Sequence, residues 1–237
     1  MKLSVIVPVY NEVDTVGRLI ERVLAVELGG VKRELIIVND GSTDGTREVL
    51  EEIGRTAPDT VGIYHHAANR GKGAAIRTAL DHVTGDVVIT QDADLEYNPE
   101  EYPKLLAPFE DPAVSVVYGS RNLRRNPRSS WSFYWGGRLV SWVANRLYGS
   151  HLTDEATGYK LIRADLLRSL RLQSEGFEFC PEVTSKLLRR GIEIHEVPIS
   201  YQPRGLDEGK KIGWRDGLAA IWTLIAHRLA RDLEEGG

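Results

Sequence analysis

The chain has 237 residues, with 34 acidic and 30 basic side chains and a formal net charge of −4. This length fits one large domain or a domain with appendages, and the acidic balance argues against general nucleic-acid binding. The single cysteine, Cys180, excludes an internal disulfide and a cysteine cluster for zinc, and it fits a reducing compartment. Because Pro8 interrupts the short apolar run at the start, a core strand is favoured there over a signal peptide.

Strand and helix patterns alternate along the first hundred residues. Apolar or β-branched runs predict four strands, at residues 3–9, 34–38, 61–64 and 87–90. Helical patterns follow the first three strands, and Asp14 is the expected N-cap of the first helix. In the second half we expect a helix over 99–109, strands over 114–118 and 192–200, and an amphipathic helix from residue 213 onward. This alternation predicts an α/β fold with a mostly parallel, Rossmann-like sheet and helices on both faces.

Two carboxylates, Asp92 and Asp94, follow directly after the strand predicted at 87–90. In an open α/β sheet, ligands bind just beyond the carboxyl ends of the strands. Paired carboxylates at that place can share Mg²⁺ or Mn²⁺, which neutralises a diphosphate. Taken alone, the Asp-x-Asp pattern also fits a turn with two solvated acids.

The other predicted strands end in polar residues as well. Residues 10–12 (Tyr-Asn-Glu) follow the first strand, Asp40 follows the second, and 71–73 (Gly-Lys-Gly) follow the third. Because parallel strands point the same way, these segments should lie along one edge of the sheet. A nucleotide lying across this edge would meet Asp40 at its base or ribose, the glycine-flanked lysine near a helix N-terminus, and Asp94 through a metal. The Gly-Lys-Gly run lacks the spacing of a P-loop and by itself fits an ordinary helix start.

The charge of the chain changes after residue 120. Residues 121–150 contain no acid and six arginines: 121, 124, 125, 128, 138 and 146. A cluster this one-sided favours an anionic partner, since a guanidinium group binds phosphate through two hydrogen bonds, although solvated arginines are the ordinary alternative. The aromatic residues among them suit an apolar chain, a membrane interface or the protein core. A second basic segment, 203–212, is rich in glycine and charge, and we expect a mobile loop there.

Four motifs in the first half, taken in order, resemble the family 2 glycosyltransferases. They lie at residues 5–12, 37–46, 69–75 and 92–95. The resemblance implies a GT-A fold, a nucleotide-sugar donor, Mg²⁺ or Mn²⁺ as cofactor, and transfer with inversion at the sugar carbon. It assigns the nucleoside to Pro8, Tyr10, Glu12 and Asp40. Together with Asp92 and with Gly71, Lys72 and Gly73, which the sheet edge already places beside the nucleotide, these are the expected donor-binding residues. It assigns the metal and the diphosphate to Asp92 and Asp94, with Glu96, where some relatives carry glutamine, as a further candidate metal ligand.

The second half resembles the polyprenyl-phosphate glycosyltransferases, the dolichyl-phosphate mannosyltransferase group. The matching segments lie at 119–121, 138–141, 153–154, 158–160, 197–204 and 209–212. In that group the lipid phosphate would be surrounded by Arg121, Arg138, Ser141, Arg204 and Lys211. Relatives often carry a basic residue where this chain has Gly136-Gly137. The resemblance favours GDP-mannose as donor, with UDP-glucose as the alternative.

The expected reaction is attack of the acceptor phosphate on the anomeric carbon, with Asp92, Asp94 and Arg121 as catalytic residues. A phosphomonoester has its second pKa near ~6, so at neutral pH it needs positioning more than a general base. A hydroxyl acceptor would need a base, for which Asp154 is the candidate; its structural alternative is a helix cap or a salt bridge to an arginine. A nucleotidyltransferase and a non-catalytic binding protein are the other classes that we consider.

We expect a catalytic domain at 1–212, with a nucleotide-sugar half at 1–98 and an acceptor half at 99–212. The amphipathic helix at 213–237 would then either lie on a membrane surface or pack on the domain. No uninterrupted apolar run approaches the roughly 20 residues of a membrane span. A cytoplasmic protein that contacts the cytoplasmic face of the membrane peripherally is therefore expected, either directly or through a membrane-anchored partner protein.

Overall fold

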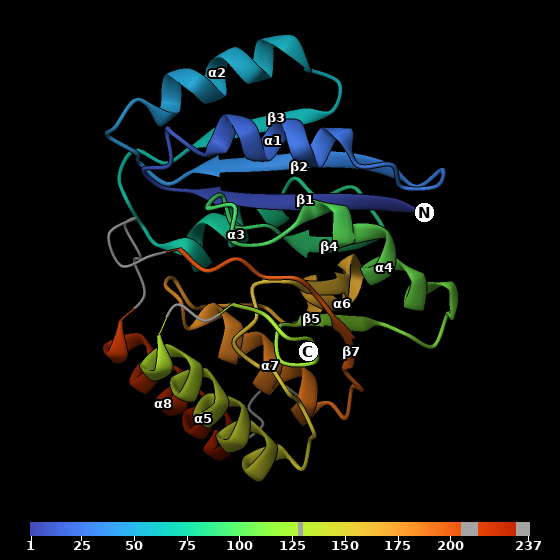
Figure 1. Cartoon of the computed structure of the whole chain (residues 1–237), viewed down its shortest axis with the longest axis vertical. Coiled ribbons are helices and arrows are strands. Elements are labelled where there is room, and N and C mark those ends of the chain that lie inside the picture. The colour runs from blue at the N-terminus through green and yellow to red at the C-terminus, as the bar shows by residue number, and fades with distance from the viewer. Residues whose placement is uncertain (128–129, 205–212, 231–237) are drawn as a thin grey trace.

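The central element of the fold is a twisted β-sheet (Figure 1). The computed structural model describes residues 1–127, 130–204 and 213–230, and in these residues seven strands form one sheet in the order β3-β2-β1-β4-β6-β5-β7. The strands are β1 (Lys2–Val9), β2 (Lys32–Asn39), β3 (Val61–His65), β4 (Val87–Thr90), β5 (Val116–Ser120), β6 (Lys160–Arg163) and β7 (His195–Pro198). The described pairings are parallel except for those of β6, which runs antiparallel to both β4 and β5.

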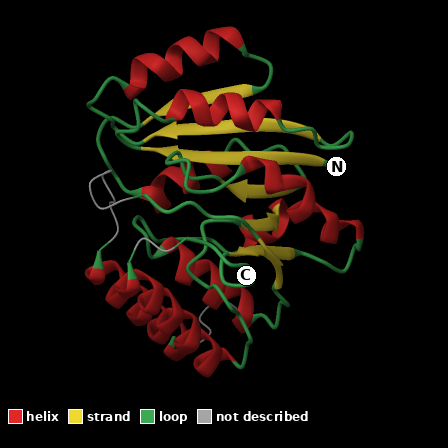
Figure 2. Ribbon diagram, in the orientation of Figure 1, coloured by secondary structure: helices red, strands yellow, loops and turns green. Residues whose placement is uncertain are grey.

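Helices cover both faces of this sheet (Figure 2). The described helices are α1 (Val16–Ala25), α2 (Thr46–Thr56), α3 (Lys72–Leu80), α4 (Tyr102–Leu106), α5 (Trp131–Tyr148), α6 (Ala164–Ser169), α7 (Phe179–Arg189) and α8 (Trp214–Leu229), with short 3₁₀ helices η1 (Pro99–Glu101) and η2 (Ala107–Glu110). Because side chains alternate along a strand, Val5 and Val7 of β1 pack with α1, α2 and α4, whereas Ile6 packs with α3, α6 and α7. The predicted α/β fold with helices on both faces is confirmed.

Two local predictions about helices differ from the structure. Asp14 is not an N-cap, because α1 begins at Val16 and Thr15 occupies the N-cap position. The helix predicted over 99–109 is divided into η1, α4 and η2. Each of these pieces has a proline in its first two positions, and proline cannot donate the backbone hydrogen bond that would continue the preceding turn.

The second half contains elements that the sequence patterns did not predict, namely α5, α6, α7 and β6. Strand β6 is only four residues long and carries a charged residue at each end, so it has no clear alternation. It nevertheless joins β4 of the first half to β5 of the second. The predicted nucleotide-sugar and acceptor halves therefore share one sheet.

Helices α5 and α8 form a pair at one end of the molecule, far from α2 (Figure 1). Val140 and Ala144 of α5 pack against Leu224 of α8 in a small core of their own. Helix α8 also packs against α7. None of the described helices is long and apolar enough to cross a membrane.

Glu34 connects three segments at the amino-terminal edge of the sheet. It accepts hydrogen bonds from Ser4 Oγ at 2.6 Å and Thr84 Oγ1 at 2.6 Å, and it pairs with Lys2. Burial by itself would raise the pKa of Glu34, but the donors Lys2, Ser4 and Thr84 outweigh it and hold the pKa at about 2, below the ordinary 4.5.

We therefore expect Glu34→Gln to lower the free energy of unfolding at pH 7. Because the folded-state pKa is depressed, this contribution is present above pH 4.5 and is lost as the pH falls toward 2. Urea unfolding of both proteins between pH 7 and pH 2 measures the difference. A difference that stays constant over this range would contradict the assignment.

Candidate active site

The carboxyl ends of β1, β2 and β4 face one cavity of about 1650 Å³. Among its lining residues are Pro8, Tyr10, Glu12, Asp40, Gly71, Lys72, Asp92, Asp94, Glu96, Arg121, Asp154 and Arg204. The expectation that these segments meet at one edge is confirmed, because β1, β2 and β4 are parallel and their ends line the same space. The cavity is larger than a typical small-molecule pocket and has room for two substrates.

Asp40 is held by donors from the segment that follows β3. Its Oδ1 accepts from the backbone N–H of Arg70 at 2.9 Å and contacts His66 Nδ1 at 2.7 Å, and its Oδ2 accepts from the N–H of Gly71 at 2.8 Å. His66 also contacts Thr78 Oγ1 at 2.9 Å, on α3. The sequence analysis did not single out His66. The ring fixes the carboxylate that faces the predicted nucleoside position.

The two glycines around Lys72 make room for another part of the protein. Gly71 has a φ of +96°, which favours glycine, and a Cβ there would collide with the backbone carbonyl of Glu175. A Cβ on Gly73 would collide with the carbonyl of Ser174, and Gly73 is not among the residues that line the cavity. The close approach that these glycines permit is therefore to the chain's own backbone at 174–175.

Lys72 begins α3 and forms an ion pair with Asp92, the first acid of the predicted metal pair. Both side chains are mostly buried, 15% and 21% exposed. Burial alone would lower the pKa of Lys72, but the Asp92 carboxylate outweighs this and raises the pKa. The ammonium group therefore stays charged and offsets one of the negative charges at the end of β4.

Asp94 lies between two other acids that line the cavity, Asp92 and Glu96. Burial, followed by the charges of Asp92 and Glu96, raises the pKa of Asp94 to about 7. Among the described residues, no three His, Cys, Asp or Glu side chains converge to form a complete metal site. Mg²⁺, however, is usually held by one or two carboxylates together with substrate phosphates and water. A half-buried Asp94 with Asp92 and Glu96 as acidic neighbours fits such a partial site.

Glu96 is engaged by the chain segment that follows β7. Its two carboxylate oxygens accept from the Tyr201 hydroxyl at 2.6 Å and from the backbone N–H of Arg204 at 2.7 Å. These donors hold the 201–204 segment across the end of β4. The structure thus gives Glu96 a positioning contact in the place where the resemblance implies a metal ligand.

Arg204 lies beside Glu12 and Asp94 in the cavity. Its guanidinium group forms a fork with Glu12, at 2.7 Å from Nη2 and 3.2 Å from Nη1, and its Nε donates to the carbonyl of Asp94 at 2.8 Å. The ion pair is largely buried, with 16% of Arg204 and 10% of Glu12 exposed. The resemblance implies that Arg204 binds the lipid phosphate, whereas these contacts tie it to residues that are expected to hold the donor.

Arg121 and Asp154 form a buried, two-point ion pair. Nε and Nη2 of Arg121 each lie 2.7 Å from an oxygen of Asp154, and the Arg121 backbone N–H donates at 2.9 Å. Burial would raise the pKa of Asp154, but the Arg121 guanidinium outweighs it and lowers the pKa. The salt bridge expected as the structural alternative for Asp154 is therefore what the structure shows. A carboxylate held in this way is a poor proton acceptor.

Two of the remaining residues assigned to the lipid phosphate, Arg138 and Ser141, do not line the cavity. Arg138 is exposed on α5. Ser141 is buried, donates to the Gly137 carbonyl at 3.0 Å and accepts from the Glu155 N–H at 3.0 Å. Lys211 and most of the predicted loop 203–212 lie outside the described residues.

Glu155 is a cavity residue that the sequence analysis missed. It is fully buried, and its carboxylate oxygens accept no hydrogen bond from the described residues. Burial raises the pKa of Glu155, although Lys160 opposes the effect. The only signal in the sequence is that Glu155 follows Asp154, and it does not distinguish this acid from a surface one.

We expect Asp154→Asn to destabilise the protein by about 3 kcal/mol, because it leaves the Arg121 guanidinium buried without its counter-charge. Urea unfolding measures the loss. Asp165→Asn is the matched control, since Asp165 pairs with Arg168 but is fully exposed. If the Asp154 and Asp165 variants lose equally little stability, the Arg121–Asp154 pair is not an important contact.

Comparison with known proteins agrees with this arrangement. The family model described as glycosyl transferase family 2 matches residues 4–171. An undecaprenyl-phosphate mannosyltransferase from Micrococcus luteus is 32% identical over 97% of this chain and 99% of its own length. An undecaprenyl-phosphate 4-deoxy-4-formamido-L-arabinose transferase from Edwardsiella ictaluri is 31% identical over 88% of this chain, which spans only 62% of that protein.

Solved structures show the same fold. Glucosyl-3-phosphoglycerate synthase from Mycobacterium tuberculosis, in complex with Mn²⁺, UDP-glucose and phosphoglyceric acid, aligns with a TM-score of 0.74 and 21% identity over 98% of this chain and 81% of that chain. Its complex with Mg²⁺ and UDP aligns with a TM-score of 0.72 and 22% identity, over the same shares of the two chains. The expected GT-A fold is confirmed by this likeness. The chain is a glycosyltransferase that belongs to glycosyl transferase family 2.

Proposed function

We propose that the enzyme transfers a hexose from a nucleotide sugar to a polyprenyl phosphate, with inversion at the anomeric carbon. One observation carries this proposal. The acid pair Asp92 and Asp94 lies in the same cavity as Arg121, and that cavity continues between α5 and α8 along apolar side chains. A site for a departing diphosphate, a cation for an arriving phosphate and a path for an apolar chain are therefore continuous.

The apolar end of the cavity favours a lipid acceptor over a small polar one. It is lined by Trp131, Leu139 and Val140 of α5 and by Leu218 and Ile221 of α8. The two relatives named above act on undecaprenyl phosphate, whereas phosphoglyceric acid is bound in the solved synthase. A small polar acid gains nothing from contact with these apolar side chains, whereas a prenyl chain is stabilised when it is buried against them.

The donor that we propose is GDP-mannose, because the relative that matches nearly the whole chain is a mannosyltransferase. UDP-glucose is the alternative, and it is the donor bound in the solved synthase. Pro8, Tyr10, Glu12 and Asp40 lie at the end of the cavity where the nucleoside would bind. Lys72, charged and beside Asp92, would face the diphosphate.

Asp94 and Asp92 would hold Mg²⁺ or Mn²⁺ together with the diphosphate. Once bound, the cation would stabilise the negative charge that grows on the leaving diphosphate. It would also favour the ionised form of Asp94, whose pKa the neighbouring acids raise. Glu96 keeps the 201–204 segment in place beside this pair.

Arg121 would orient the acceptor phosphate. Its fork with Asp154 fixes the guanidinium plane, which lies 5.1 Å from the Tyr201 ring centre and lines the cavity. The dianionic phosphate then needs no general base. Only the resemblance supports Arg138, Ser141 and Lys211 as proposed residues of the acceptor side, because Arg138 and Ser141 do not line the cavity. We also propose that the enzyme contacts the cytoplasmic face of the membrane peripherally.

A transfer assay with a polyprenyl phosphate, Mn²⁺ and radiolabelled GDP-mannose or UDP-glucose tests the proposal. We expect label in the organic phase with the wild-type enzyme, and none with Asp94→Ala, whose circular dichroism should match the wild type. Label in a water-soluble product instead would indicate a hydroxyl acceptor. If the Asp94→Ala variant still transfers sugar, the assignment of Asp94 as a metal ligand is wrong.

We expect Arg204→Gln to weaken nucleoside diphosphate binding by about tenfold, since it breaks the charged fork that fixes Glu12. Isothermal titration with GDP and UDP measures the change. Arg124→Gln, which removes an arginine from the other side of the cavity, should leave this affinity unchanged. If Arg204→Gln instead impairs only the use of the lipid phosphate, Arg204 acts on the acceptor as the resemblance implies.

A further inference from the structure

All five tryptophans of the chain lie on α5 and α8, and all are exposed. The exposed fractions are 65% for Trp131, 62% for Trp135, 62% for Trp142, 72% for Trp214 and 70% for Trp222. Tryptophan is among the side chains that gain most from burial. Five of them in water on two neighbouring helices indicate an interaction surface.

The exposed residues of α5 form a stripe along the helix. Trp131, Trp135, Leu139 and Trp142 follow one another at spacings of three and four residues, which places them on one face. Leu139 is 50% exposed. The opposite face, with Val140 and Ala144, is buried against α8. The stripe therefore points away from the protein core.

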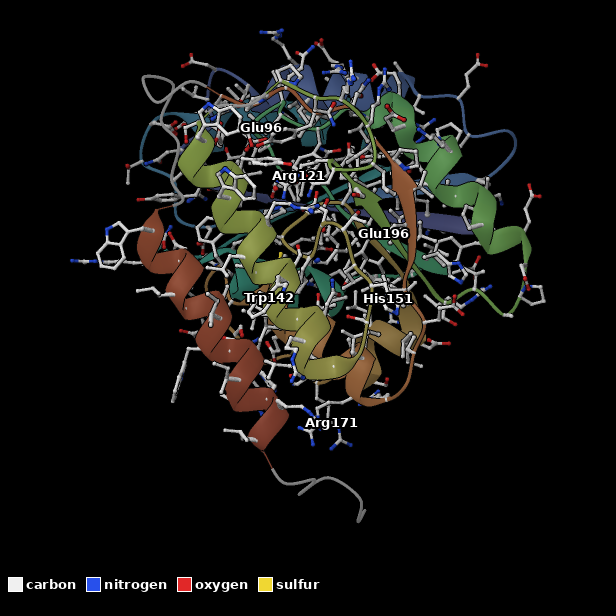
Figure 3. The ribbon with its side chains drawn as sticks, turned by 60° about the horizontal axis from the view of Figure 1, so that its bottom comes forward. Glu96, Arg121, Trp142, His151, Arg171 and Glu196 are labelled. Atoms are coloured by element: carbon white, nitrogen blue, oxygen red, sulfur yellow. The ribbon has the colours of Figure 1, made fainter. Side chains whose placement is uncertain are left out.

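Helix α8 carries a matching stripe, made of Trp214, Leu218, Trp222 and Leu229, while Leu224 on its other side is fully buried. The two helices lie side by side, as Figure 3 shows with Trp142 on α5. Tyr148 donates to the Leu224 carbonyl at 2.7 Å. We call the eight exposed residues of the two stripes the tryptophan face: Trp131, Trp135, Leu139, Trp142, Trp214, Leu218, Trp222 and Leu229.

The charges carried by α5 and α8 themselves are mainly positive, while Glu175 and Glu178 line a groove beside Trp222. Exposed arginines accompany it on both helices: Arg138 and Arg146 on α5, and Arg215 and Arg228 on α8. Helix α5 contains no acid, and the acid of α8, Asp216, accepts from the Gly213 N–H at the start of its own helix. The whole chain, by contrast, has a net charge of −4.

The tryptophan face is continuous with the candidate active site. Trp131 and Leu139 from α5 and Trp214 and Leu218 from α8 belong to the face and also line the cavity. In Figure 3, Glu96 and Arg121 lie at the upper end of the helix pair, and Trp142 lies lower on α5. The cavity therefore opens where the two stripes begin.

We propose that the tryptophan face docks on an anionic lipid bilayer and lies in its interface, so that the cavity opens directly onto the lipid. Tryptophan and arginine together are typical of surfaces that bind at the headgroup level of anionic membranes. The need for such a surface rests on the proposed function, because a polyprenyl phosphate stays in the bilayer. A second copy of the chain would bring the same arginines against each other, which disfavours a dimer through this face.

Vesicles of phosphatidylcholine and phosphatidylglycerol at about three to one provide the test. Because all five tryptophans lie on α5 and α8, their emission reports on this face alone. We expect a shift to shorter wavelength when the wild-type protein meets vesicles, and sedimentation with them. Both signals should weaken when phosphatidylglycerol is omitted.

The variant Trp142→Ser/Trp222→Ser changes exposed residues that do not line the cavity. We expect about tenfold weaker partitioning onto vesicles, since two anchors are lost, with an unchanged melting temperature and unchanged transfer to a short, water-soluble prenyl phosphate. Trp142→Phe/Trp222→Phe should retain much of the binding. Arg146→Gln should weaken binding, whereas Arg55→Gln, an exposed arginine on the distant α2, should not.

Several results would overturn the docking surface. The first is a serine variant that binds vesicles as well as the wild type does. The second is a wild-type protein that does not bind vesicles. The third is a wild-type dimer that the serine substitutions dissociate. If vesicle binding fails while transfer to the short prenyl phosphate persists, the proposed function stands and this inference does not. Vesicle binding without transfer to any acceptor would leave the docking surface in place and contradict the proposed function.

Discussion

Crowded negative charge at the carboxyl end of β4 is the constraint on which the site depends. Asp92, Asp94 and Glu96 lie within five residues of one another and are largely withdrawn from water. Burial raises the pKa of Asp94 to about 7, with its two neighbours adding to the effect, so the cluster is costly without compensating cations. Lys72 supplies one cation beside Asp92, and Arg204 another beside Glu12 and the Asp94 carbonyl.

These cations also connect distant parts of the chain. Lys72 comes from the start of α3, and Arg204 comes from the segment after β7. Their partners lie at the ends of β4 and β1. The Arg204 contacts therefore hold the second half of the chain across the carboxyl ends of β1 and β4. In the proposed function, the same negative charge would bind a divalent cation together with the diphosphate.

A separate charge pair organises the other side of the cavity. Strand β6 runs antiparallel between β4 and β5, so the chain that leads into it passes the end of β5. This brings Asp154 beside Arg121 in a buried fork. The arrangement leaves Asp154 poorly suited to act as a base and fixes Arg121 beside the proposed acceptor position. Beyond it, α5 and α8 pair through a small core and leave their tryptophans in solvent.

The sequence alone determined the parallel sheet of the first half, its strands and the meeting of their polar ends. These features follow from local signals, because a buried parallel strand is a short apolar run and parallel strands must end on the same side. The family motifs also predicted the GT-A fold, because they can be recognised in the sequence without knowing how the elements pack. Tertiary structure alone decided which cation meets which acid, since the partners of Arg204 and Arg121 are remote in sequence. It also decided that the apolar stripe of α8 faces outward, because that depends on which side of the helix α5 and α7 cover.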